Sequence, residues 1–174
     1  MIGQLGNACI VVFYGGMKMY KHSDLDDSYI SLHDCQAEKI KFDHGVLSFF
    51  FPEGFWITGQ HPQNKSEEIV RTDAAQVDFS IIDEEIDGIE ISVFKENKKG
   101  KVIREDWEPI NFIDAVNCGD YRVEFITQYK SYQSILFKCW VWFEKSPYHY
   151  ECEIILHTEQ VIYKWNQLRY ECVW

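Results

Sequence analysis

The sequence predicts a mainly β protein, built as an antiparallel two-sheet sandwich or a flattened barrel with one short helix. Two observations lead to this fold class. Apolar and polar residues alternate with a period of two in many short segments, and turn residues such as Gly, Pro, Asn and Asp separate these segments. Aromatic residues make up 16% of the chain, and with the β-branched residues they favour the pleated surface of a sheet.

The length of 174 residues predicts one domain. Residues 17–174 are expected to form this single β-rich domain, because the stretch from Met17 reads as a natural translation start. Residues 1–16 are expected to be an N-terminal extension or an added edge strand. Their apolar run, Ala8–Tyr14, follows no Lys or Arg and is too short to span a bilayer.

The first half of the chain predicts strands separated by tight turns. Asp43-His-Gly45 has a glycine where a hairpin turn needs a positive φ, and Pro52-Glu-Gly54 predicts the next turn. The polar stretch 59–68 predicts a mobile loop. Strands are expected at 29–35, 37–42, 46–51, 55–58 and 75–81.

A hairpin and one helix are expected next. Residues 89–93 are predicted to pair with Val102 and Ile103 across an exposed tip. Asp106 is predicted to cap a helix that ends just before Gly119. The expected helix has Pro109, Phe112, Ile113 and Val116 on one face, and an irregular strand over 110–116 is the alternative.

Three antiparallel strands over 121–156 are expected to form the centre of the protein. In the first, Tyr121, Val123, Phe125, Thr127 and Tyr129 are expected on the buried face, and Ile126 is the one apolar residue on the wetter face. The second, 135–143, is apolar on both sides, which predicts a central strand covered on both faces. The third covers 148–156, and 161–165 predicts a fourth strand after a bend.

Charge and cysteine content exclude several function classes. The net charge of −11 and the absence of a long Lys/Arg cluster argue against nucleic acid as a direct ligand. No pair among the six cysteines has C-x-x-C spacing, so neither a structural zinc site nor another cofactor is expected. Because no export signal or membrane span is evident, we expect reduced cysteines and a cytoplasmic location.

Two acidic segments and one reactive cluster are the candidate functional residues. A basic protein partner would be attracted to the acidic segments, although a solvated negative surface explains them equally. His33 and Cys35 would share one side of a strand and could form a thiolate pair, or the cluster could satisfy backbone groups. The candidate partner-binding residues are Asp24, Asp26, Asp27, His33, Asp34, Asp83, Glu84, Glu85 and Asp87. No catalytic residue and no metal ligand is predicted.

The segment Leu32-His-Asp-Cys35, followed by Ile40–Leu47 and Phe49–Phe55, resembles the opening of small, uncharacterised bacterial β proteins. In those proteins an L-H-D motif precedes a strand, a D-G turn and a second strand. The pattern also resembles immunity-type proteins of polymorphic toxin systems. Here the turn reads Asp43-His-Gly45 in place of D-G. The resemblance implies a cytoplasmic, non-catalytic binder and transfers no site residues.

The leading hypothesis is therefore a non-catalytic binding protein that acts through protein–protein contact, with immunity against a basic toxin domain as its specific form. The alternative is a small-ligand binder or hydrolase with an aromatic-lined cleft at one end of the sheets. A homodimer joined by edge strands is a third expectation, because an open sheet has to protect its edges.

Overall fold

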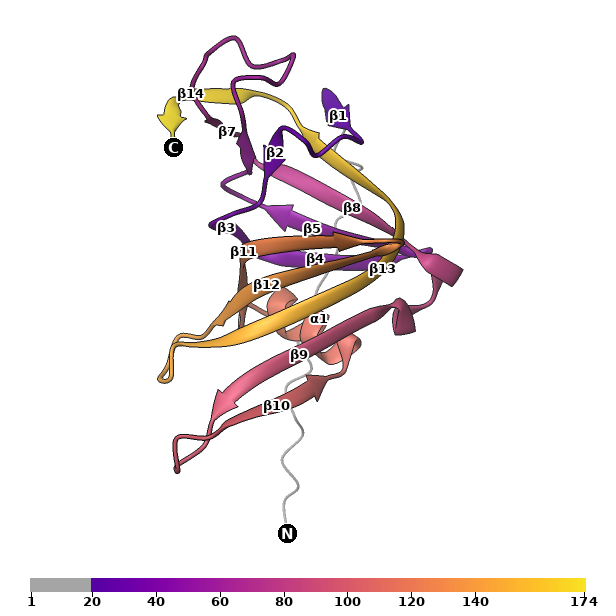
Figure 1. Cartoon of the computed structure of the whole chain (residues 1–174), viewed down its shortest axis with the longest axis vertical. Coiled ribbons are helices and arrows are strands. Elements are labelled where there is room, and N and C mark those ends of the chain that lie inside the picture. Colours follow the sequence, from indigo (N-terminus) through magenta and orange to yellow (C-terminus); the bar gives the residue numbers. More distant parts are fainter. Residues whose placement is uncertain (1–19) are drawn as a thin grey trace, which may run out of the picture.

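The computed structural model describes residues 20–174, so the expectations for residues 1–16 and for Met17 lie outside the described residues. The described chain forms a 10-stranded and a 4-stranded antiparallel sheet (Figure 1). The large sheet contains β1 (His22–Asp24), β3 (Cys35–Ala37), β4 (Lys39–Asp43), β5 (Val46–Phe51), β8 (Ala75–Ile81), β9 (Ile89–Glu96), β10 (Val102–Trp107), β11 (Arg122–Ser131), β12 (Ser134–Trp142) and β13 (His149–Trp165). The small sheet contains β2 (Ile30–Ser31), β6 (Trp56–Ile57), β7 (Val70–Thr72) and β14 (Leu168–Val173).

Strand β13 joins two layers of the large sheet. Its first part pairs with β12 and β9, which belong to the lower layer together with β3, β10 and β11. Its second part pairs with β8 and β1, which belong to the upper layer together with β4 and β5. The register shifts between Thr158 and Gln160, so the bend expected there is a bulge inside one continuous 17-residue strand. The two layers face each other across the core, which confirms the predicted sandwich, and the described residues form no closed barrel.

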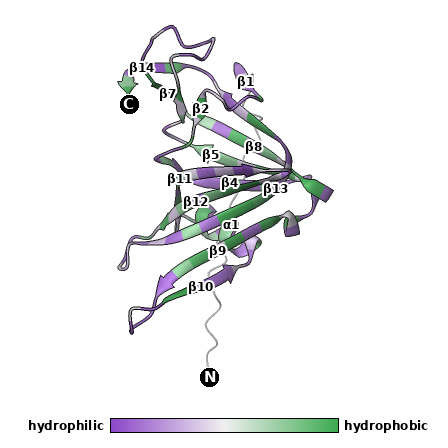
Figure 2. Cartoon of the chain, in the orientation of Figure 1, coloured by the Kyte–Doolittle hydropathy of each residue, from purple (hydrophilic) through white to green (hydrophobic). Residues whose placement is uncertain are grey.

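The core between the layers follows the period-two pattern, which is visible along β9, β12 and β13 in Figure 2. On the lower layer, Phe125 and Phe137 are buried. Their rings meet those of Phe49 and Phe79 on the opposite layer at centroid distances of 5.2 Å and 5.7 Å. These edge-to-face contacts are the geometry that aromatic rings prefer, and they connect β11 and β12 to β5 and β8.

A bulge in β11 changes which residues face the core. The register shifts between Phe125 and Thr127, at the position of Ile126. Beyond it, Gln128 and Lys130 take the inward side of the strand, and Thr127 and Tyr129 are exposed. The prediction that Thr127 and Tyr129 belong to the buried face was therefore wrong, because an extra residue inverts the alternation.

The helix α1 (Pro109–Asn117) closes the side of the sandwich between β4 and β9. Phe112 and Val116 are buried on its inner face, as the spacing predicts. Gly119 has φ 82° just past the helix end, which only glycine adopts without strain. Asp106 does not cap the helix as expected, because β10 extends through it and Glu108 occupies the N-cap position.

Strand β12 is covered on its inner face only. Ile135, Phe137, Cys139 and Val141 are buried against the upper layer. On the other face Trp140 and Trp142 are half-buried. The His149 ring stacks on Trp140 at a centroid distance of 4.8 Å and packs at a tilt against Trp142 at 4.9 Å. The expectation of cover on both faces was wrong for the described residues, since neighbouring side chains shield these tryptophans in place of a third layer.

The hairpins and turns of the first half form as predicted at Asp43–Gly45 and Pro52–Gly54. The loop 59–68 is folded around two buried side chains, His61 and Asn64. The Asn64 amide donates to the carbonyls of Thr58 and Glu68 at 3.1 Å and 2.9 Å. The polar residues of this segment therefore form hydrogen bonds that hold the loop in place, in contrast to the mobile loop that was expected. In the described part of the chain, the helix is not long or apolar enough to cross a membrane.

Candidate functional site: an open groove beside the acidic loop

The acidic loop after β1 uses two of its carboxylates to hold itself in place. The Nε2–H of His61 donates to Asp24 at 3.0 Å, because the amide of Gln63 already donates to the His61 Nδ1 atom at 3.1 Å. Asp26 accepts from both the amide and the hydroxyl of Ser28, and these bonds hold the pKa of its carboxyl below the usual range. Both carboxylates are therefore committed to loop structure.

Asp27 ties this loop to the two central strands. Its carboxylate pairs with Lys130 and accepts from the Gln128 amide at 3.1 Å and from the Tyr163 hydroxyl at 3.5 Å. Burial raises the pKa of Tyr163, and the neighbouring Asp27 charge adds to this shift, so the hydroxyl stays protonated and donates. The bulge at Ile126 makes the contact possible, since it turns Gln128 and Lys130 inward.

Two adjacent cavities form one open groove along this contact. The first, of about 460 Å³, lies between the acidic loop and β11, and its walls include Asp27 and His33. The second, of about 510 Å³, lies between the loop, the β11–β12 hairpin and β13. Both are lined by Asp27 and Lys130, so this ion pair stands where the cavities meet. We call the two cavities together the binding groove.

The rim of the second cavity carries exposed apolar side chains. Leu25 and Tyr132 are 61% and 87% exposed, and both line the cavity. Tyr132 lies at the tip of the β11–β12 hairpin, where Gln133 has a positive φ of 51°. Reasoning from sequence missed both residues. The available signal was a large aromatic side chain in the short polar turn 131–134, where no core packing requires one.

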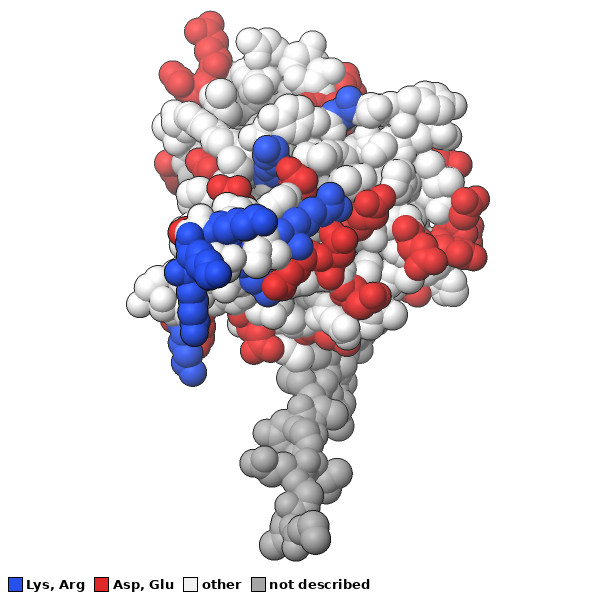
Figure 3. Space-filling view, turned by 60° about the horizontal axis from the view of Figure 1, so that its bottom comes forward, with Lys and Arg blue, Asp and Glu red and all other residues white. Residues whose placement is uncertain are grey.

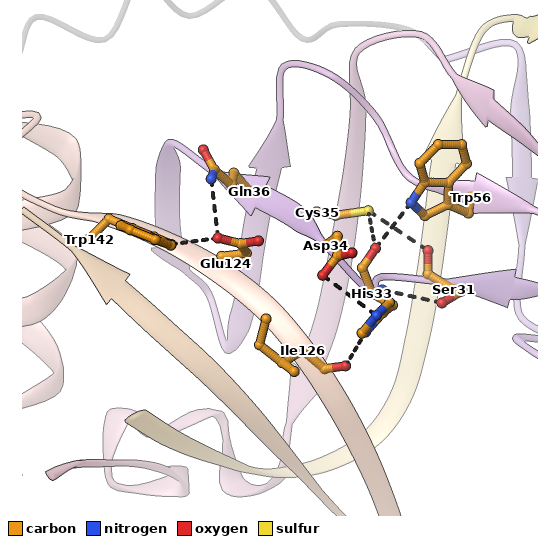
Figure 4. Close-up of polar contacts among 9 residues, drawn as sticks. All are labelled: Ser31, His33, Asp34, Cys35, Gln36, Trp56, Glu124, Ile126 and Trp142. Atoms are coloured by element: carbon orange, nitrogen blue, oxygen red, sulfur yellow. Dashed lines mark hydrogen bonds and ion pairs between the residues drawn. The ribbon is translucent and has the colours of Figure 1, made fainter. Parts of the chain in front are cut away.

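His33 lines the first cavity, and Figure 4 shows its polar contacts. Its Nδ1–H donates to the Ile126 carbonyl at 2.5 Å, which leaves Nε2 at 3.5 Å from the Asp34 carboxylate. The ring stacks on Trp174 at a centroid distance of 5.3 Å, and the His33 carbonyl accepts from the Trp56 indole at 3.1 Å. His33 and Asp34 thus fasten the loop to the edge of β11.

The thiolate pair considered for His33 and Cys35 does not form. His33 and Asp34 are in a turn, with Asp34 at φ 55°, so the strand parity that would place both side chains on one side does not apply. Cys35 is fully buried, and its thiol contacts the His33 carbonyl oxygen at 3.4 Å instead of the imidazole ring. Burial raises the pKa of the Cys35 thiol to about 12, so it is not a nucleophile at neutral pH.

We expect native thiol labelling to separate the cysteines by burial. Cys139 and Cys152 face each other across β12 and β13, and burial raises the pKa of both thiols. With maleimide at pH 8, Cys35, Cys139 and Cys152 should label only after denaturation, whereas exposed Cys118 should label in the native state. Mass spectrometry of the labelled peptides checks this. Native labelling of Cys35 as fast as that of Cys118 would contradict the buried assignment.

The acidic side chains of the second acidic segment are exposed. Asp83, Glu84, Glu85 and Asp87 lie in two short 3-10 turns between β8 and β9, and Asp83 and Glu84 both have positive φ. Within the described residues, none of these carboxylates has an ion-pair or hydrogen-bond partner. The segment follows Ile81, which pairs with Thr158, and Thr158 and Glu159 line the second cavity. The turn therefore packs beside the part of β13 that lines the second cavity, although none of its four carboxylates lines either cavity.

The predicted partner-binding residues thus have unequal roles. Asp27 and His33 line the groove, and Asp24 and Asp26 hold the loop that forms its wall. The acidic turn lines neither cavity and packs against β13 beside the second one. No group of three or more His, Cys, Asp or Glu side chains within residues 20–174 could hold a metal ion. Comparison of the chain with protein-family models, curated proteins and solved structures finds no match.

Proposed function

We propose that this protein is a non-catalytic binding protein that acts by contact with a protein partner. The observation that carries the proposal is the open groove with an exposed leucine and tyrosine on its rim. Tyrosine supplies a large contact area with little loss of conformational freedom and is enriched among residues that dominate interface energies. The reactive side chains near the groove are already engaged. His33 is hydrogen-bonded to a backbone carbonyl, Asp27 is paired with Lys130, and Cys35 is buried.

We propose further that the partner is basic, and that it is a toxin domain neutralised by this protein as its immunity protein. The acidic turn supports this proposal, because its four carboxylates are exposed and the turn packs against β13, which lines the groove. Carboxylates without partners raise the association rate of a cationic protein, and the net charge of −11 acts in the same direction. A cytoplasmic location belongs to the same proposal.

The direct test begins with the neighbouring genes. A toxin encoded beside this gene should be neutralised when both are expressed in one bacterial host, and the purified pair should bind. Tyr132→Ala should weaken that binding at least tenfold, since a truncated anchor residue costs more than about 1.4 kcal/mol. Glu84→Lys together with Glu85→Lys should mainly slow association and reduce its dependence on salt.

The matched control is Tyr129→Ala. Tyr129 is 55% exposed on the same hairpin but faces away from the groove, so binding should remain unchanged. Equal affinity of the wild type and Tyr132→Ala for the toxin would exclude the groove as the contact surface. A gene beside metabolic enzymes, with a small metabolite that binds the purified protein, would replace this proposal by the small-ligand alternative.

A further inference from the structure

The outer edge of β10 is an open end of the large sheet. Among residues 20–174, β10 pairs with β9 alone. The Asn97 amide donates to the Lys101 carbonyl at 2.9 Å, and this bond determines which alternate residues of β10 are hydrogen-bonded to β9. Ile103, Glu105 and Trp107 therefore bond to β9, and the backbone N–H and C=O groups of Val102, Arg104 and Asp106 point outward.

Another edge of the same sheet is protected in a way that β10 is not. At β4, the Asn117 side chain accepts from the Ile40 amide at 3.0 Å and donates to the Ile40 carbonyl at 2.8 Å. These two bonds replace a neighbouring strand. Within residues 20–174 no such backbone partner is present for the outward groups of β10. An unprotected edge of this kind is a template for another strand.

Charge is ordered along β10 in a way that fits a second copy of the same strand. Lysines 98, 99 and 101 come before it and have no ion pair within the described chain. Glu105, Asp106 and Glu108 come at its end, where Glu105 also pairs with Lys95 and Asp106 with Arg104 of the same chain. Figure 3 shows cationic side chains gathered beside anionic ones at the end of the molecule where this hairpin lies. Antiparallel pairing of two copies would place the basic half of each strand beside the acidic half of the other.

We propose that β10 pairs with β10 of a second copy, antiparallel, around a two-fold axis at Ile103. Outward-pointing residues must meet outward-pointing ones, and an overlap of at least three residues of each β10 strand then allows axes at Ile103, Arg104, Glu105 or Asp106. An axis at Arg104, Glu105 or Asp106 would oppose two like charges. The axis at Ile103 pairs two isoleucines, each 43% exposed in the monomer, and sets Lys101 of each copy opposite Glu105 of the other. This edge lies away from the binding groove, so the inference goes beyond the proposed function.

Single cysteines placed on three of these axes test the register. The variants are Ile103→Cys, Arg104→Cys and Glu105→Cys, each in a protein whose Cys9, Cys118 and Cys172 are replaced by serine. Residues on the axis face their own copies with Cβ atoms close enough for a disulfide. Under mild oxidation at micromolar concentration, Ile103→Cys should give the highest yield of disulfide-linked dimer. A higher yield from either of the others, or no dimer from any, would overturn the proposal.

A charge-exchange cycle tests the energetics by sedimentation equilibrium. Lys101→Glu and Glu105→Lys should each raise the dimer dissociation constant about tenfold, because each change opposes like charges at two symmetric places. The double variant should return it close to the wild-type value, and 0.5 M salt should weaken the wild-type dimer. Tyr132→Ala should leave it unchanged, which separates this interface from the binding groove. A monomer at every concentration, or a dimer insensitive to both single variants, would overturn the proposal.

Discussion

Replacing Phe125 with alanine is expected to lower the free energy of unfolding by about 4 kcal/mol. Phe125 is 1% exposed, and its ring meets those of Phe49, Phe51 and Phe137 at centroid distances of 5.2, 5.4 and 5.0 Å. Two of these neighbours belong to the opposite layer of the sandwich. Truncation would therefore leave a cavity where β5 meets β11, and the rigid strands around it could collapse only in part.

Urea denaturation followed by tryptophan fluorescence measures this loss. Tyr129→Ala is the matched control, since it removes an aromatic ring from the same strand at a site that is 55% exposed, and it should change stability by less than about 0.5 kcal/mol. A loss below about 1.5 kcal/mol for Phe125→Ala would mean that the aromatic cluster does not join the layers.

The central strands could be predicted because the alternation of apolar and polar residues indicates which face of each strand is buried. Val123, Phe125 and Phe137 are buried as the period-two pattern requires. The pattern could not locate the inversion in β11, although one signal was present. Ile126 is apolar on a polar side, and in the structure it lies where the register shifts. A single misplaced apolar residue is a weak sign of a bulge, but here it decides which side chains reach the groove.

The groove itself could not be predicted, because its walls come from segments far apart in the chain. Asp27 meets Lys130, and Asp24 meets His61, only after β1 has paired with the end of β13. Composition marked the acidic loop and turn as candidates, but it could not separate carboxylates that hold a loop from carboxylates that have no partner. The structure makes that distinction through hydrogen-bond partners, and the acidic turn is the segment whose carboxylates have none within the described residues.

Removing the Lys164 ammonium from its ion pair with Asp78 is expected to have the second large effect on the free energy of unfolding. Asp78 lies on β8, and its carboxyl is only 10% exposed. Lys164 on β13 approaches it at 2.5 Å, and the Gln76 amide donates to its other oxygen at 2.6 Å. Lys164→Met keeps the aliphatic stem but removes the ammonium, so a nearly buried carboxylate loses its countercharge. We expect a loss of about 3 kcal/mol, since breaking a buried pair costs far more than the pair contributes.

Two comparisons separate the cost of the stranded charge from other causes. Adding Asp78→Asn to Lys164→Met should recover more than half of the loss, because a neutral amide needs no countercharge and still bonds to Gln76. Lys41→Met removes the ammonium from an exposed pair with Asp43, whose side chains are 47% and 48% exposed, and should cost less than about 0.5 kcal/mol. Equal losses from Lys41→Met and Lys164→Met would show that water screens both pairs alike. The expected difference follows from burial alone, since the two pairs have the same chemical groups at similar distances.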